Sequence, residues 1–112
     1  MRFSSTRIST RAEFKEVFKK GRFFEEKYYK FFITASANFK FAVVVSKKVG
    51  NAVTRNLIKR RIRNIVWPHY KTGKFKFVII TRPGIENIKF SILEKQIKNI
   101  VEIYEKNISI AD

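Results

Sequence analysis

A basic helix between two β-rich runs is the feature that most restricts the fold of this chain. The runs at 39–46 and 75–82 are rich in aromatic and β-branched residues, which favour strands. Between them, Asn51 can cap a helix that starts at about Ala52 and that ends before Pro68. A strand, a helix and a strand in this order indicate a fold in which helices cover a short sheet.

Two capping boxes mark further helices near the two ends of the chain. Thr10, followed three residues later by Glu13, predicts a first helix over about residues 11–20. A second box begins at Ser91, and apolar residues at helical spacing continue from it. A last helix should therefore run to about Lys106.

Two closely spaced runs predict how the sheet begins. Residues 28–35 and 39–46 are both β-rich and lie only three residues apart, a spacing suited to an antiparallel hairpin. Segment 22–27 could form a short extra strand. The prediction is an α+β fold, a small α/β sandwich of order α-β-β-α-β-α, in a single domain over residues 1–112.

The positive charge of the chain is concentrated in its middle. Residues 27–85 hold fourteen of the 25 Lys and Arg and none of the nine acids, in a chain of net charge +16. A concentrated positive field is typical of a surface that binds a polyanion. Nucleic acid is favoured over an anionic membrane, because most aromatic residues lie in the predicted strands rather than opposite the cations of an amphipathic helix.

The predicted basic helix has one apolar and one basic face. At about 100° per residue, Ile58, Ile62 and Ile65 cluster on the side that should pack against the sheet. Like charges repel one another unless an outside anion neutralises them, so the acid-free opposite face predicts contact with nucleic acid. This face comprises Arg55, Asn56, Lys59, Arg60 and Arg63.

The turn before this helix should bind phosphate as well. Lys47 and Lys48 precede Gly50 and Asn51, and the N–H groups of a helix N-terminus favour anions. RNA is favoured over DNA, because a helix held between two strands differs from a helix-turn-helix or a dimeric basic region.

The sequence contains no recognisable catalytic or metal site. It has no Cys, its only His is His69, and its only Asp is Asp112. Its Glu residues are scattered, whereas hydrolysis of a phosphodiester generally needs clustered carboxylates or positioned acids and bases. We therefore expect no catalytic residue, no bound metal and no cofactor in the protein itself.

Composition also bears on the location of the protein. The absence of Cys favours a reducing compartment. The first ten residues lack the apolar run of a signal peptide, and no stretch approaches the length of a membrane span. We expect a cytoplasmic protein with no membrane partner.

Three segments of the chain resemble a known family. The run VVSKKVGNAVTRNLIKRRIR (44–63) closely resembles the signature of the bacterial ribonuclease P protein component. EFKEVFKKG (13–21) is similar to the first helix of that family, and FVIITR (77–82) to its strand after the basic helix. One departure is Leu57, which stands where the third residue of the family's Arg-Asn-Arg triplet would be.

The resemblance implies a small RNA-binding subunit that assists a catalytic RNA. The holoenzyme is an endoribonuclease that removes the 5′ leader of precursor tRNA, and its RNA subunit requires Mg²⁺ and carries out the cleavage. The protein would pair with that RNA in a 1:1 complex and would be inactive alone. The family also implies a left-handed β-α-β crossover, against the usual right-handed rule. By position, the basic face and the preceding turn would contact the RNA subunit.

The resemblance further implies a separate cleft that receives the leader. From the residues alone, Phe14 and Phe18 at helical spacing would more often be core, whereas Lys30, Phe32 and Thr34 share a mixed strand face that looks exposed. The alternative function is a small ribosomal or other structured-RNA-binding protein with no role in cleavage. The leader cleft carried over from the family comprises Phe14, Phe18, Lys20, Phe32, Val44 and Ser46.

Overall fold

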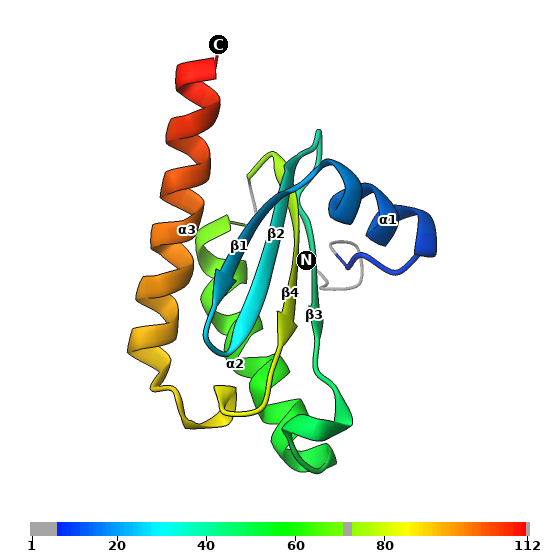
Figure 1. The fold of residues 1–112 in the computed structure, drawn as a ribbon, viewed down its shortest axis with the longest axis vertical. Coiled ribbons are helices and arrows are strands. Elements are labelled where there is room, and N and C mark those ends of the chain that lie inside the picture. Colours follow the sequence, from blue (N-terminus) through cyan, green and yellow to red (C-terminus); the bar gives the residue numbers. More distant parts are fainter. Residues whose placement is uncertain (1–6, 71–72, 112) are drawn as a thin grey trace.

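A computed structural model describes residues 7–70 and 73–111 of the chain. Three helices pack on one four-stranded sheet (Figure 1), which is the predicted α+β order with the possible extra strand at its start present as β1. In chain order the elements are α1 (Arg11–Lys20), β1 (Arg22–Glu26), β2 (Tyr29–Ala35), β3 (Lys40–Val44), the 3₁₀ turn η2 (Lys47–Val49), α2 (Ala52–Tyr70), β4 (Phe75–Thr81), the 3₁₀ turn η3 (Ile85–Asn87) and α3 (Phe90–Ala111).

The order of strands in the sheet is β1-β2-β4-β3. β2 pairs antiparallel with β1 on one side and with β4 on the other, while β3 pairs in parallel with β4. The predicted hairpin between residues 28–35 and 39–46 is therefore wrong. Side chains on both faces of β4 are buried, Phe77 on one and Val78 on the other, which suits a central strand better than an edge strand. β1, the segment that could form an extra strand, makes the hairpin with β2 instead.

The parallel pairing of β3 and β4 requires a crossover, and α2 provides it. In Figure 1 both strands run downward, and α2 passes behind the sheet from β3 on the right to β4 on its left. This connection is left-handed, as the family resemblance implies.

The two faces of the sheet are covered unequally. α2 and α3 cover one face and enclose the main core, in which Phe31, Ile33 and Phe77 from the sheet meet Ile62 and Ile97 from the helices. α1 covers only part of the other face, where buried Val17 packs with Ala42 and Val78 in a smaller cluster. Part of this second face stays open to solvent.

The ends of α2 and α3 differ from the sequence expectations, and α3 also runs on to Ala111, beyond the predicted end at about Lys106. Asn51 Oδ1 accepts from the Thr54 N–H at 2.9 Å and so caps α2 as predicted, but the helix continues through Pro68 to Tyr70. Because Pro68 lies in the last turn, few residues of the helix follow it and little helical structure is lost. The partly buried Tyr70 ring packs against the core. α3 begins at Phe90, so Ser91 lies inside its first turn and does not cap it.

Candidate nucleic-acid interface

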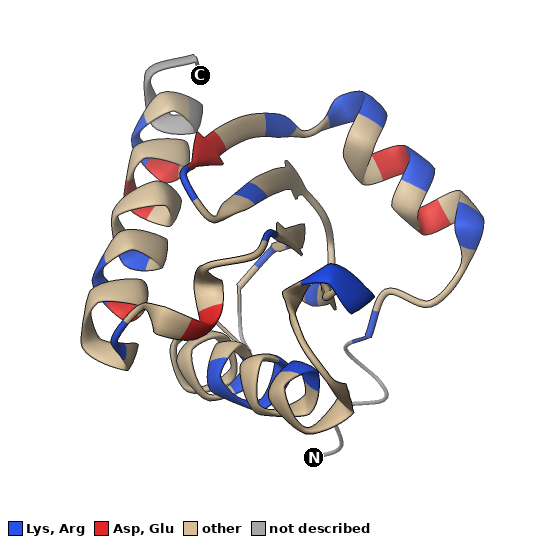
Figure 2. Ribbon diagram, turned by 60° about the horizontal axis from the view of Figure 1, so that its bottom comes forward, with Lys and Arg blue, Asp and Glu red and all other residues tan. Residues whose placement is uncertain are grey.

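The basic face of α2 lies opposite the buried isoleucines, as the sequence predicts, and is partly exposed. Ile58, Ile62 and Ile65 are buried against the sheet, and the opposite side of the helix points away from the core. Arg60 and Asn56 are exposed, whereas Arg55, Lys59 and Arg63 are half-buried. Figure 2 shows Lys and Arg following one another along α2 without an acid between them, while the acids among the described residues lie on α1, β1, α3 and the segment before α3.

The turn before α2 holds two lysines at the start of the helix. Lys47 and Lys48 are exposed in η2, which buried Val49 anchors to the core. A Cβ atom on Gly50 would lie 3.0 Å from Cβ and Cγ2 of Thr54, so glycine allows the turn to approach the first turn of α2 closely. Both lysines therefore continue the basic face beyond the N-terminus of the helix.

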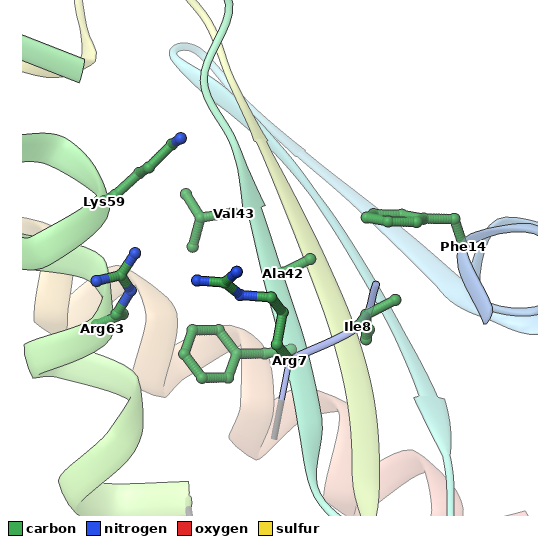
Figure 3. Close-up of a pocket in the computed structure, with 8 residues that line it drawn as sticks. Arg7, Ile8, Phe14, Ala42, Val43, Lys59 and Arg63 are labelled. Carbon is green, nitrogen blue, oxygen red and sulfur yellow. The ribbon is translucent and has the colours of Figure 1, made fainter. Parts of the chain in front are cut away.

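A cavity of about 210 Å³ lies between α2 and the edge strand β3 (Figure 3). Lys59 and Arg63 reach it from α2, and Arg7 reaches it from the N-terminal segment. This segment pairs with β3 in parallel, because the Ile8 N–H donates to the Phe41 carbonyl oxygen at 3.1 Å. Among the described residues that line the cavity there is no carboxylate, so their charge is purely positive.

Sequence reasoning missed Arg7. Its position depends on pairing between a terminal segment and β3, about thirty residues away in the chain, which local patterns do not report. The only local signal is Ile8, an apolar residue just before the capping box that turns out to be buried.

The open face of the sheet carries a row of phenylalanine rings. The Phe14 and Phe18 ring centroids on α1 lie 6.1 Å apart, and Phe18 lies 4.9 Å from Phe32 on β2. Phe23 on β1 extends the row, 5.0 Å from Phe32. Phe18 is 41% exposed, whereas a phenylalanine that served only the core would be largely buried.

The other expected leader residues lie around this row, and of these Lys20 lines a shallow pocket together with Phe18. Val44 ends β3 on the same face as Phe32 and is exposed, and Ser46 follows it just before η2. Lys20 is exposed in the last turn of α1. The structure thus brings Phe14, Phe18 and Phe32 into contact and sets the remaining three at the margins. Phe23 was not expected from the sequence, because its place beside Phe32 depends on the β1–β2 register.

Ion pairs hold α1 against the sheet and so position its rings. Glu13 Oε2 lies 2.8 Å from Lys40 Nζ on β3 and 3.8 Å from Lys76 Nζ on β4. Glu16 reaches Lys76 at 3.4 Å. The hydrogen bond from Lys40, together with its charge and the Thr10 hydroxyl, holds the pKa of Glu13 below its usual value. This carboxylate therefore stays ionised and clamps α1 across two strands.

Several of the other acids are engaged in pairs of their own. The Arg82 Nη2 donates to Glu25 Oε2 at 2.5 Å, and His69 Nε2 lies 3.3 Å from Glu94 Oε2. Within residues 7–70 and 73–111, no three His, Cys, Asp or Glu side chains gather as a metal site would require. None of the helices in the described part of the chain is long and apolar enough to cross a membrane.

A family model and similar sequences of known proteins point to the same family. The family model for ribonuclease P matches residues 4–105. The ribonuclease P protein component of Streptococcus pneumoniae is 36% identical over 104 residues, which cover 87% of this chain and 82% of the relative.

Solved structures agree in fold. A Staphylococcus aureus RNase P protein superimposes with a TM-score of 0.76 at 27% identity, over 88% of this chain and 94% of the other. A mutant of the Staphylococcus aureus protein with defective mRNA degradation activity gives a TM-score of 0.78 at 26% identity, over 91% and 90% of the two chains. The RNase P protein of Thermotoga maritima, at 24% identity over 84% of this chain and 93% of the other, shares the fold with a TM-score of 0.70. The chain therefore belongs to the bacterial ribonuclease P protein components, which act with the ribonuclease P RNA as subunits of a tRNA-processing endoribonuclease.

Proposed function

We propose that this chain binds the RNA subunit through α2 and binds the 5′ leader of precursor tRNA through the open face of the sheet. The observation that carries the proposal is the arrangement of two chemically different surfaces around β3. α2 and α1 lie on opposite faces of the sheet, and the cavity at the β3 edge is lined by Lys59 and Arg63 from one side and by Phe14 from the other. A protein built in this way can contact two RNA segments at once.

The α2 surface suits a folded RNA. Its cations and one amide form a rigid, acid-free surface about two to three turns long, with Lys47 and Lys48 at its N-terminal end. Contacts of this kind neutralise phosphates and respond to shape rather than to sequence. Leu57, the departure from the family triplet, is half-buried at the margin of this surface, so its replacement of a cation removes little exposed charge.

The open face suits an unpaired strand. Exposed aromatic rings beside cations hold single-stranded RNA by base stacking, which tolerates any base. Phe18 and Phe32 supply the rings, while Lys30 on β2 and Lys20 on α1 supply positive charge on or next to this face. Tolerance of this kind fits a leader whose sequence differs from one tRNA to the next.

We further propose that the cleavage step and its Mg²⁺ belong to the RNA subunit. Glu13 and Glu16 on α1 and Glu25 on β1 are all paired with basic side chains rather than grouped as metal ligands. The protein would then contribute binding alone, in a 1:1 complex in the cytoplasm, and would carry no cofactor. Purified protein freed of RNA should leave precursor tRNA intact.

The test is reconstitution with the cognate RNA subunit at low Mg²⁺, with affinities measured for precursor and mature tRNA. Phe18→Ala should weaken precursor tRNA binding by about 1–3 kcal/mol and leave mature tRNA binding unchanged, because only the precursor has a leader base to stack there. Phe90→Ala is the matched control, since Phe90 is 38% exposed but lies at the start of α3. Equal losses for both tRNAs would mean that Phe18 only supports the fold, and co-purification with ribosomal RNA would favour the alternative function.

A further inference from the structure

Phe23 is an exposed aromatic residue on the edge strand of the sheet. It is 49% exposed, more than Phe18, and β1 has no strand on its outer side within the described residues. In the β1–β2 ladder Phe23 lies directly opposite Phe32, and the two rings are 5.0 Å apart with their planes tilted by 35°. Phe32 therefore covers one side of the Phe23 ring and leaves much of the rest open to solvent.

A single exposed phenylalanine needs no functional explanation, but this one continues a row. The row runs from Phe14 to Phe18 on α1, then to Phe32 on β2 and to Phe23 on β1, with successive centroids 6.1, 4.9 and 5.0 Å apart. Phe23 ends this row at the sheet edge. A single-stranded RNA whose bases stack on Phe18 and Phe32 and that continues in the same direction would reach Phe23 next.

The charges around Phe23 are compatible with an RNA backbone. Glu25, two residues along β1, shares its face and would repel phosphate if it were free. It is bonded instead to Arg82 and lies opposite Lys30 in the strand register. Two cations thus offset the one acid on this face of β1, so a phosphate can approach.

We propose that Phe23 is an additional stacking position for one unpaired base of the leader RNA, at the β1 edge beyond Phe32. The proposal rests on the leader binding proposed for Phe18 and Phe32, and it adds one nucleotide to the bound segment. Because a phenyl ring stacks on any base, the position adds affinity with leader length rather than sequence preference.

The experiment uses the reconstituted holoenzyme and precursor tRNAs whose leaders grow one nucleotide at a time. With the native protein, affinity should rise in steps until the leader spans the row. Phe23→Ala should remove one step, lowering affinity for longer leaders by about five-fold or more, while the shortest leaders bind as they do to the native protein. Phe23→Trp, which keeps a ring, should retain the step, and Phe90→Ala should match the native protein at every length.

The outcomes separate this inference from the leader binding on which it rests. If Phe18→Ala weakens precursor binding and Phe23→Ala changes it at no length, the Phe23 position is refuted and leader binding stands. If neither change matters, leader binding on this face is itself refuted. A loss with Phe23→Ala that is equal for all leaders and for mature tRNA would overturn the inference, because it would show an effect on folding, which thermal unfolding of the same variant would report.

Discussion

Glu13 should be the main electrostatic tie between α1 and the sheet, and Glu13→Gln tests this. The carboxylate receives Lys40 from β3 at 2.8 Å and faces Lys76 from β4 at 3.8 Å, and the Glu13 side chain is only 18% exposed. The amide of glutamine keeps the size of the side chain but removes its charge. Lys40 then loses a carboxylate partner, and Lys76 keeps only Glu16.

The magnitude follows from the exposure of the partners. An ion pair in full solvent contributes about 0.2–1 kcal/mol, and a hydrogen bond to a charged group about 1.5–3 kcal/mol. With 31% of the Lys40 side chain exposed, the Glu13–Lys40 pair lies between these cases, at about 1 kcal/mol, and the longer Lys76 contact adds a few tenths. Glu13→Gln should therefore lower the free energy of unfolding by about 1.5 kcal/mol and the melting temperature by about 6 °C.

The assay is urea unfolding of a double-mutant cycle between Glu13→Gln and Lys40→Met. The pair should show a coupling free energy of about 1 kcal/mol. Glu16→Gln is the control, because Glu16 is 42% exposed and meets Lys76 at 3.4 Å, so its change should cost less than about 0.5 kcal/mol.

The pH dependence provides a second readout of the same contact. Hydrogen bonding to Lys40 lowers the pKa of Glu13 in the folded protein below its usual value of 4.5. Its contribution is therefore complete above about pH 4.5 and disappears as the pH falls through the folded value. The stability gap between native protein and Glu13→Gln should narrow in acid. A coupling energy near zero together with a constant gap would refute the role of Glu13 as an anchor.

Two further predictions concern the β3 edge and the turn before α3. Arg7→Ala should weaken binding to the RNA subunit and reduce the slope of log affinity against log salt concentration by about one. Arg11→Ala, outside the cavity, should leave the slope closer to the native value. Equal slopes for all three proteins would exclude a phosphate contact at Arg7. Gly84→Ala should lower the free energy of unfolding in urea by about 2 kcal/mol, because Gly84 has φ of 106° and a new Cβ would lie 2.3 Å from Cε1 of Tyr28. Native stability of this variant would contradict that clash.

Local features of the structure could be predicted from the sequence, and long-range pairings could not. The capping box at Thr10, the Asn51 cap and the division of α2 into isoleucine and basic faces all depend on residues within a few positions of one another. They were predicted for that reason.

The order of strands depends instead on which distant segment buries both of its faces. The runs 28–35, 39–46 and 75–82 are similarly apolar and favour strands equally, so closeness in the sequence favoured the wrong pairing. The central position of β4 became evident only from the structure of the sheet. Arg7 and Phe23 were missed for the same reason, since each joins its surface through a pairing made elsewhere in the chain.

The central position of β4 has a consequence for how the protein is made. β2 and β3 are synthesised early but do not pair with each other. β2 can pair with β1, yet both β2 and β3 need β4, which emerges only after α2, to join one sheet. Such non-local pairing slows folding, because a long loop must close, with loss of chain entropy, before any contact compensates for that loss. On the ribosome, the complete sheet that supports both Phe32 and α2 cannot form until residue 81 has left the exit tunnel. Both RNA-binding surfaces should then appear together, and a nascent chain cut short before β4 should have neither.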